Sequence, residues 1–228
     1  MKNDSSHYIT KLQSLLEANA DQVYASSMKK YMRNQFEFLG ISSPRRKELF
    51  RTYVRENGWP ETEEMEQVCR DLYLNRHREY HYYAIEMIDR NIKRFNEASV
   101  KLFEYMIVTN AWWDTVDFIA ANILGKFFKR YPGLISEVTE KWMNSGNIWL
   151  QRSCILFQLK YKKNTDLPLL YSFIQILRTS DEFFIQKAIG WILREYSKSD
   201  PKEIQAYSGR TDLKPLSRRE ALRIINKK

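Results

Sequence analysis

Glycine and proline are scarce in this chain of 228 residues, which contains seven glycines and six prolines. All-β folds use many such residues, because their tight turns need positive or fixed φ angles. The scarcity therefore argues against an all-β fold and favours helices throughout. With 43% hydrophobic and 14% aromatic residues, the chain can nevertheless bury a substantial core. We expect a single domain over residues 1–228.

Cysteine and histidine are also scarce. The two cysteines, Cys69 and Cys154, lie far apart in the sequence, and the three histidines are His7, His77 and His81. Neither the spacing of a zinc site nor that of a haem attachment motif is present. The sequence therefore predicts no metal and no cofactor. Cysteines without a framework of partners are typical of a reducing compartment.

Long apolar runs are missing as well. No stretch of about 18 apolar residues occurs, which is the length that a membrane-spanning helix needs. The N-terminal sequence MKNDSSHYITKLQSLL lacks the uninterrupted apolar core of a signal peptide. We therefore expect no membrane partner and a cytoplasmic location. We also expect a monomer.

The basic excess of the chain is unevenly distributed. Its net charge is +9, yet residues 1–140 contain 20 basic and 20 acidic residues. Residues 141–228 contain 17 basic and 8 acidic residues, and residues 29–55 contain eight basic and two acidic ones. Two basic regions suit a polyanion, of which nucleic acid is the commonest. On charge alone, a solvated basic surface without a partner is an equally good interpretation.

Helical periodicity and capping residues predict helices along the whole chain and no strand. Ser43 is expected to cap a helix that begins at Pro44, and Asn110 is expected to cap the helix that follows it. The segments that begin at Asp200 and Ser217 resemble capping boxes. Besides the helix from Pro44 to the break at Gly58, helices are expected over residues 8–16, 23–38, 62–74, 78–94, 97–109, 112–131, 134–143, 148–162, 167–178, 183–198 and 217–226.

Four short segments repeat at offsets of 36, 34 and 35 residues. They begin at His81, Asp117, Gln151 and Gln186, and each has small residues two to four positions after its polar residue. A period of this length holds two helices and is typical of α-solenoids, most nearly of HEAT-type pairs. The sequence therefore predicts an all-α fold, an α-solenoid of HEAT-like helix pairs curved around a concave face. Asp117, Gln151 and Gln186 are expected to share that concave wall.

The segment 110–117 combines two tryptophans with two aspartates at the start of a predicted helix. Trp113 and Asp117 are four residues apart and so share one face of that helix. We interpret this pair as the centre of a catalytic site. Core tryptophans with solvated aspartates in a first helical turn are the ordinary alternative. Asp114 points away from Asp117 and is interpreted as such a helix-start charge.

Cations and aromatic residues are interleaved in two later segments. Lys187 lies four residues before Trp191 and seven before Arg194, so these three side chains share a helix face. In segment 147–152 a tryptophan lies three residues before an arginine. Nucleic-acid grooves combine these types, because cations contact phosphates and aromatic faces contact bases or sugars. Ordinary repeat packing is the alternative, which we prefer for Trp149 but not for Trp191.

Six motifs then carry a resemblance to a known family. They are YMRNQFEFLGI (31–41), WWDTVD (112–117), NIWLQR (147–152), LFQLKYK (156–162), FFIQKAIGWILREY (183–196) and PLSRREA (215–221). Together they resemble the bacterial DNA alkylation repair glycosylases of the AlkD type, which are built of HEAT-like repeats. The resemblance implies that the enzyme removes N3- and N7-alkylated purines from double-stranded DNA by hydrolysis of the N-glycosidic bond. It also implies that the base is not flipped into a pocket.

The resemblance further implies roles for individual residues. Asp117 corresponds to the catalytic carboxylate, and Trp113 and Trp191 correspond to the indoles that hold the deoxyribose of the lesion. Arg152 corresponds to a cation beside the scissile nucleotide, and we expect it at the rim of the concave face. The DNA-binding residues implied are Tyr31, Ser42, Ser43, Lys47, Lys160, Phe183, Phe184, Lys187 and Arg194. Among these, Ser42, Ser43 and Lys47 depart from the Gln-Thr pair and the arginine that the family commonly has.

Two other classes of function stay open from the residues alone. One is a non-catalytic relative that binds distorted duplex DNA. The other is a protein-binding α-solenoid, because a fold of this kind does not by itself define a function. Formation of abasic sites and salt-dependent affinity for duplex DNA distinguish these classes from a glycosylase.

Overall fold

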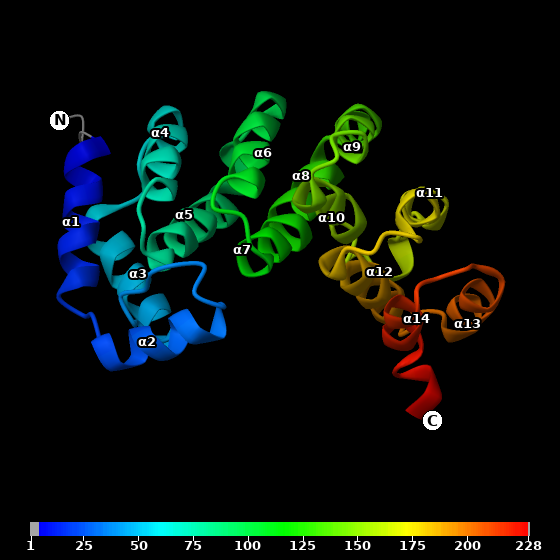
Figure 1. Ribbon diagram of the computed structural model, residues 1–228. Helices are drawn as coiled ribbons and strands as arrows, with labels where there is room; N and C mark the ends of the chain where they lie inside the picture. The colour runs from blue at the N-terminus through cyan, green and yellow to red at the C-terminus, as the bar shows by residue number, and fades with distance from the viewer. Residues whose placement is uncertain (1–4, 228) are drawn as a thin grey trace. The chain divides into compact units, whose positions relative to one another are not determined.

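The computed structural model describes residues 5–227, and all of its regular structure is helical (Figure 1). Within these residues there is no strand, and one isolated bridge joins Glu37 and His77. The all-α prediction is therefore confirmed. The chain forms two compact units, one that ends at Ala98 and one that begins at Ser99. The expectation of a single domain stays a prediction. None of the described helices is long and apolar enough to cross a bilayer.

The first unit has a core rich in tyrosine. Its helices are α1 (Ser5–Glu17), α2 (Gln22–Tyr31), α3 (Ser43–Asn57), α4 (Thr62–Tyr73) and α5 (Arg78–Asn91). The hydroxyls of Tyr8 and Tyr83 share a hydrogen bond of 2.5 Å, and the Tyr53 hydroxyl donates to the Tyr8 carbonyl at 2.5 Å. Burial raises the pKa of Tyr8 to about 12. These phenols therefore stay neutral and join α1, α3 and α5.

A buried carboxylate fixes the segment between α2 and α3. Glu79 accepts the backbone N–H groups of Leu39 and Gly40 at 3.0 Å each and that of Ile41 at 3.3 Å. Gly40 has a φ of 84°, and a Cβ at this position would lie 1.9 Å from the Asp21 carbonyl oxygen. Only glycine fits here without a shift of the backbone. The start of α3 is thus held by contacts that are distant in sequence.

Two expected boundaries in this unit were wrong. The helix expected over residues 23–38 ends early, because Arg33 and Asn34 have φ angles of 55° and 59°. Such left-handed residues cannot continue a right-handed helix. Helix α3 begins at Ser43 itself, with Ser42 as its N-cap. The proline that was expected at the first helical position therefore occupies the second.

The second unit is a stack of helix pairs in two layers, as the repeat predicted (Figure 1). Helices α7, α10, α12 and α14 follow one another in one layer, and α6, α9, α11 and α13 pack against them in the other. The bounds are α6 (Val100–Val108), α7 (Trp113–Phe118), α8 (Gly125–Arg130), α9 (Ile135–Met143), α10 (Ile148–Leu156), α11 (Leu167–Leu177), α12 (Phe183–Tyr196), α13 (Pro201–Arg210) and α14 (Pro215–Leu222). This arrangement is that of an α-solenoid.

The helix expected over residues 112–131 contains a π-helical segment. It consists of α7, the π-helix Ile119–Leu124 and α8. Its N-cap is Trp112, whereas Asn110, the expected cap, has a φ of 48° and lies before the helix. π-Helical turns are rare and occur frequently at functional sites. This one begins two residues after Asp117, so a period of 3.6 residues does not describe the side chains that follow it.

Helices α12 and α14 approach each other closely at Gly190. A Cβ there would lie 2.5 Å from the Glu220 Cβ and 2.9 Å from the Ser217 carbonyl oxygen. Ser217 lies inside α14 instead of capping it, and its hydroxyl donates to the Gln186 carbonyl at 3.0 Å. The capping box expected at this serine was therefore wrong. The one expected at Asp200 is confirmed for the aspartate, which accepts a backbone N–H at the start of α13.

Gly190→Ala is expected to lower the free energy of unfolding by about 1–3 kcal/mol, because the added methyl group overpacks the contact with α14. Urea denaturation measures this change. Gly209→Ala is the matched control, since Gly209 lies within helix α13 and a Cβ there would meet nothing within 4 Å. The control should be neutral or stabilising by up to about 1 kcal/mol. Equal effects of the two substitutions would contradict the close contact at Gly190.

Candidate active site

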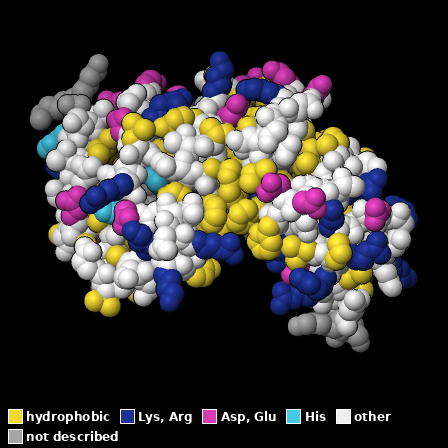
Figure 2. Space-filling view, in the orientation of Figure 1, with side chains coloured by type: hydrophobic (Ala, Val, Ile, Leu, Met, Phe, Trp, Pro, Cys, Tyr) yellow, Lys and Arg dark blue, Asp and Glu magenta, His cyan; other side chains and the backbone are white. Residues whose placement is uncertain are grey.

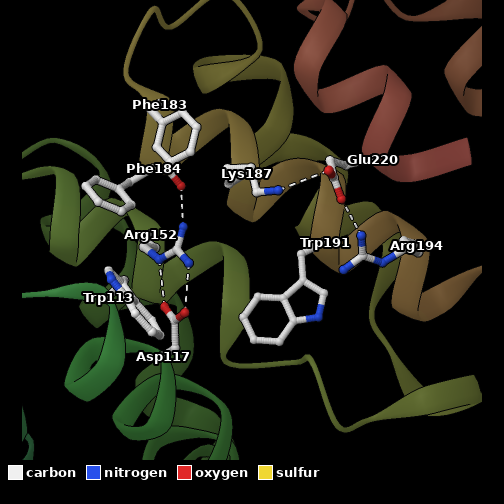
Figure 3. A pocket seen from close by; sticks show the side chains of 9 residues that line it. All are labelled: Trp113, Asp117, Arg152, Phe183, Phe184, Lys187, Trp191, Arg194 and Glu220. Atoms are coloured by element: carbon white, nitrogen blue, oxygen red, sulfur yellow. Dashed lines mark hydrogen bonds and ion pairs between the residues drawn. The ribbon is translucent and has the colours of Figure 1, made fainter. Parts of the chain in front are cut away.

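One pocket in the second unit collects the residues that were predicted to carry the chemistry (Figure 3). Its volume is about 340 Å³. Four helices of the same layer, α7, α10, α12 and α14, contribute to its lining. The lining residues are Trp113, Asp117, Arg152, Phe183, Phe184, Lys187, Trp191, Arg194 and Glu220. Side chains separated by as many as 107 positions in the sequence, from 113 to 220, thus meet in one cavity.

Asp117 and Arg152 form a bidentate ion pair in this pocket (Figure 3). Arg152 Nε donates to Asp117 Oδ1 at 2.7 Å, and Arg152 Nη2 donates to Asp117 Oδ2 at 2.8 Å. The third nitrogen, Nη1, donates to the Phe184 carbonyl oxygen. The two charged side chains are 15% and 4% exposed. The guanidinium therefore links α7, α10 and α12 and fixes the orientation of the carboxylate.

The burial of Arg152 corrects one expectation. Arg152 was expected at the rim of the concave face, where it would grip a phosphate and also hold the Asp117 carboxylate ionised, but only 4% of its side chain is exposed. It is buried because α10 lies between α7 and α12, which supply its two partners, Asp117 and Phe184. This position favours a role in holding the carboxylate. A direct contact with phosphate would require the arginine to leave its present partners.

Opposing effects act on the Asp117 carboxyl. Burial raises the pKa of Asp117 above its ordinary value, whereas the hydrogen bonds and the charge of Arg152 lower it. The nearby charge of Asp114 adds a smaller increase. Burial prevails, so the pKa of Asp117 lies above that of an exposed aspartic acid. Arg152 is thus the group that keeps this carboxyl from becoming a still weaker acid.

Two indoles lie on opposite sides of the Asp117 carboxylate (Figure 3). Trp113 precedes Asp117 by one turn of α7, and Trp191 comes from α12. Both side chains are half-buried, and Phe183, at the start of α12, is 52% exposed. The negative faces of aromatic rings attract cations. The arrangement therefore offers a positively charged group one carboxylate and two ring faces.

An aromatic cluster behind the pocket joins Phe184, which lines the cavity, to two tryptophans. The Phe184 ring lies 5.1 Å from that of Trp112 and 4.9 Å from that of Trp149, and these two tryptophans lie 5.8 Å apart. Neither tryptophan contributes to the cavity wall. The interpretation of Trp149 as a packing residue agrees with this placement. By packing against Phe184, the cluster also supports the carbonyl that accepts the hydrogen bond from Arg152.

Lys187 and Arg194 line the pocket together with Glu220, an acidic residue that was not predicted from the sequence to belong to the site. Lys187 Nζ lies 3.0 Å from Glu220 Oε1, and Arg194 Nη1 donates to Glu220 Oε2 (Figure 3). Burial raises the pKa of Glu220, but the two cations lower it by more, so it lies below its ordinary value. Glu220 had been interpreted as part of a capping box. No local pattern predicts a pairing across 26 and 33 residues.

Gln151 and Gln186 were expected to share the concave wall with Asp117, and neither of them lines the pocket that contains Asp117. The side-chain amide of Gln151 donates to the Met143 carbonyl at 3.0 Å, and that of Gln186 donates to the Ser180 carbonyl at 3.2 Å. Each glutamine therefore ties its helix to the chain that precedes it. The repeat correctly aligned equivalent helix positions. The repeat did not show that, of Asp117, Gln151 and Gln186, Asp117 alone lines the cavity.

Lys160 lies outside the pocket and is exposed. Its ammonium donates to the side-chain oxygen of Asn122, which belongs to the π-helical segment. Asn122 in turn donates to the Phe118 carbonyl at 3.0 Å. Figure 2 shows further Lys and Arg side chains gathered over the last helices of this unit, which agrees with the charge excess of residues 141–228.

The other four residues expected to bind DNA belong to the first unit. Tyr31 ends α2 and is 73% exposed, and Ser42 caps α3. Ser43 and Lys47 are exposed in α3. These placements leave the side chains accessible to a partner. Their part in DNA binding stays a prediction.

The cysteines offer no nucleophile to the pocket. Cys69 and Cys154 are free and buried, and burial raises the pKa of both thiols. A thiol with a raised pKa is a poor nucleophile. Within residues 5–227, no group of three or more His, Cys, Asp or Glu side chains could hold a metal ion.

Stacked helix pairs with a buried carboxylate and guanidinium, two indoles and nearby cations define a class of HEAT-like repeat protein. The profile of the family described as "DNA alkylation repair enzyme" matches residues 12–225. The chain therefore belongs to the DNA alkylation repair enzyme family, and the resemblance inferred from its motifs is confirmed.

Comparison with solved structures gives the same result. The structure resembles that of a "Predicted DNA alkylation repair enzyme from Enterococcus faecalis", with a TM-score of 0.84 and 33% sequence identity. The similarity covers 92% of this chain and 98% of that one. No curated protein matched the chain. The family assignment thus rests on both sequence and fold.

Proposed function

We propose that this protein is a DNA glycosylase that hydrolyses the N-glycosidic bond of N3- and N7-alkylated purines in double-stranded DNA, the first step of base excision repair. The observation that carries the proposal is the Asp117 carboxylate, which Arg152 fixes in a pocket walled by Trp113 and Trp191. Membership of the DNA alkylation repair enzyme family supports the choice of DNA as the substrate.

The chemistry of alkylated purines suits such a pocket. Alkylation at N3 or N7 gives the purine a positive charge, so the bond to C1′ breaks with the electron pair moving to the base, which leaves neutral. Positive charge then develops on the deoxyribose, where a fixed carboxylate and aromatic faces stabilise it. Water adds its oxygen to C1′ and loses a proton. Because the base leaves neutral, one carboxylate is sufficient and no general acid is needed.

The lining of the pocket also supports action without base flipping. Enzymes that flip a base read its edge with hydrogen-bonding groups inside a pocket. Here Asp117 is paired with Arg152, and Glu220 is paired with Lys187 and Arg194. The charged lining groups are thus engaged with one another, and the remaining lining residues are aromatic. Such a lining suits a sugar with developing charge better than the polar edge of a base.

Abasic-site formation in methylated plasmid DNA tests the proposed function. We expect the protein to generate abasic sites in methylated plasmid and none in untreated plasmid, measured as strand breaks after alkaline treatment. Binding to duplex that weakens with salt, without abasic sites, would show a non-catalytic DNA-binding protein. Absence of salt-dependent duplex affinity would favour the protein-binding solenoid instead.

Lys160→Ala is expected to weaken duplex binding regardless of sequence and to reduce the magnitude of the salt slope by about one unit, as the loss of one phosphate contact does. Fluorescence anisotropy of a labelled duplex over a series of salt concentrations measures both quantities. Lys202→Ala is the matched control, because Lys202 is exposed in α13, in the other layer of helices. A parental slope for the Lys160 variant would remove this residue from the interface.

A further inference from the structure

Glu220 places a negative charge in a pocket that we assign to a polyanion. Its side chain is 12% exposed and lines the cavity beside Lys187 and Arg194. A carboxylate at this place repels phosphate and so opposes the affinity that the two cations supply. Glu220 therefore does not contribute to the site by attracting DNA, and it must act in another way.

The packing of α14 on α12 fixes where this carboxylate lies. The Cβ of Glu220 lies directly over Gly190, so closely that no side chain fits between the two helices. One turn earlier in α14, the Ser217 hydroxyl donates to the Gln186 carbonyl of α12 at 3.0 Å. These two contacts hold the turn of α14 that carries Glu220. The carboxylate is thus presented to the pocket from a rigid element.

The two oxygens of Glu220 bind different cations. Oε1 lies 3.0 Å from Lys187 Nζ, and Oε2 accepts from Arg194 Nη1. Trp191 follows Lys187 by four residues and precedes Arg194 by three, so all three share one face of α12 (Figure 3). A single carboxylate therefore restrains the cation on each side of the indole. Arg223, which is 60% exposed, lies farther from Oε2, with its Nη1 at 4.0 Å. Glu220, Lys187 and Arg194 together carry one positive charge, whereas the two cations alone would carry two.

We propose that Glu220 is a positioning residue, which fixes Lys187 and Arg194 beside Trp191 and whose charge limits the affinity for undamaged duplex. This inference rests on the proposed glycosylase function. Long cationic side chains that are already held lose less conformational entropy when the lesion is bound. Weaker binding to undamaged DNA favours release from sites that carry no lesion. Glu220 thus lowers the affinity for undamaged duplex and, in the same position, fixes the two cations that meet the lesion.

Two substitutions separate the charge of Glu220 from its geometry. Glu220→Gln removes the charge and keeps the size, so undamaged duplex should bind more tightly, with a salt slope steeper by about one unit. Base release under single-turnover conditions should be about tenfold slower, because the cations lose their fixed positions. Glu220→Asp keeps the charge but is one methylene group shorter, so it cannot reach both cations. It should retain the parental salt slope and still release the base more slowly.

Glu195→Gln is the matched control. Glu195 lies on α12, the helix that carries Lys187 and Arg194, and forms an ion pair with 2.6 Å between its Oε2 and Lys198 Nζ, but this pair is exposed and Glu195 does not line the pocket. Its neutralisation should leave the rate of base release at the parental value. Circular dichroism and urea denaturation of each variant check that α14 remains folded. If Glu220→Gln does not fold, Glu220→Asp tests the geometric role by itself.

The possible outcomes distinguish a failure of the role proposed for Glu220 from a failure of the proposed glycosylase function. A parental rate of base release in both Glu220 variants would overturn the positioning role. Weaker binding of undamaged duplex by Glu220→Gln would overturn the claim that the charge of Glu220 limits affinity. Tighter binding combined with slower release is the result that supports it, and a purely structural defect does not produce that combination. If the parent protein itself releases no base, the proposed glycosylase function fails instead, which the same assay shows before any variant is compared.

Discussion

We expect Asp117→Asn to lower the single-turnover rate of base release by about 10²–10³-fold, the size of effect seen when one preorganised electrostatic group is removed from an active site. Asparagine keeps the shape of the side chain and one oxygen that can accept from Arg152. It loses the charge that, in the proposed mechanism, stabilises the positive charge developing on the sugar in the transition state. Affinity for the alkylated duplex should not fall, since Asp117 is buried and carries no charge that attracts phosphate.

Asp114→Asn provides the control for this prediction. Asp114 lies in the first turn of the same helix, and its charge raises the pKa of Asp117. Its variant should release the base at close to the parental rate. A parental rate for Asp117→Asn as well would remove Asp117 from the chemistry. Weakened binding with an unchanged single-turnover rate would assign it to recognition instead.

The second large effect is expected at Arg152. Arg152→Ala leaves a buried carboxylate without its partner and should lower the free energy of unfolding by about 3–5 kcal/mol. Arg152→Lys keeps the charge but loses the planar fork that binds both Asp117 oxygens and the Phe184 carbonyl. The lysine variant should therefore bind duplex nearly as well as the parent and release the base about 10–100-fold more slowly. Full activity with lysine would show that charge alone is sufficient.

Arg152→Ala should also shift the pH dependence of base release. Arg152 lowers the pKa of Asp117 against the effect of burial, so its removal raises that pKa further. In the proposed mechanism the ionised carboxylate is the active form, so we expect activity to be lost as the pH falls through this pKa. The acid limb of the pH–rate profile should move to higher pH in Arg152→Ala. Single-turnover rates, corrected for spontaneous base loss, measure the shift, and an unmoved limb would mean that another group titrates.

The sequence predicted the features of the molecule that depend on local periodicity. Scarce glycine and proline and a repeat of about 35 residues are enough to predict stacked helix pairs, because each pair must bury its apolar faces against the next. Within the site, Trp113 and Asp117 share a helix face, as do Lys187, Trp191 and Arg194. Spacings of three and four residues have a fixed meaning in a helix. These residues do line one pocket.

Features that depend on packing between distant helices could not be predicted. Arg152 is buried because its partners come from α7 and α12, and no spacing within α10 shows this. Glu220 meets Lys187 and Arg194 only because Gly190 lets α14 approach α12. The π-helical turn after Asp117 breaks the 3.6-residue period on which the sequence argument relied.

The most direct test of our central claim, that the Asp117 pocket breaks the N-glycosidic bond, is product analysis by mass spectrometry. The substrate is a duplex oligonucleotide with a single 7-methylguanine, incubated with excess protein. We predict free 7-methylguanine in an amount equal to that of the abasic strand, and none above the spontaneous level with Asp117→Asn. An intact strand after saturating binding would contradict the claim, and so would a strand that loses the methyl group but keeps its guanine.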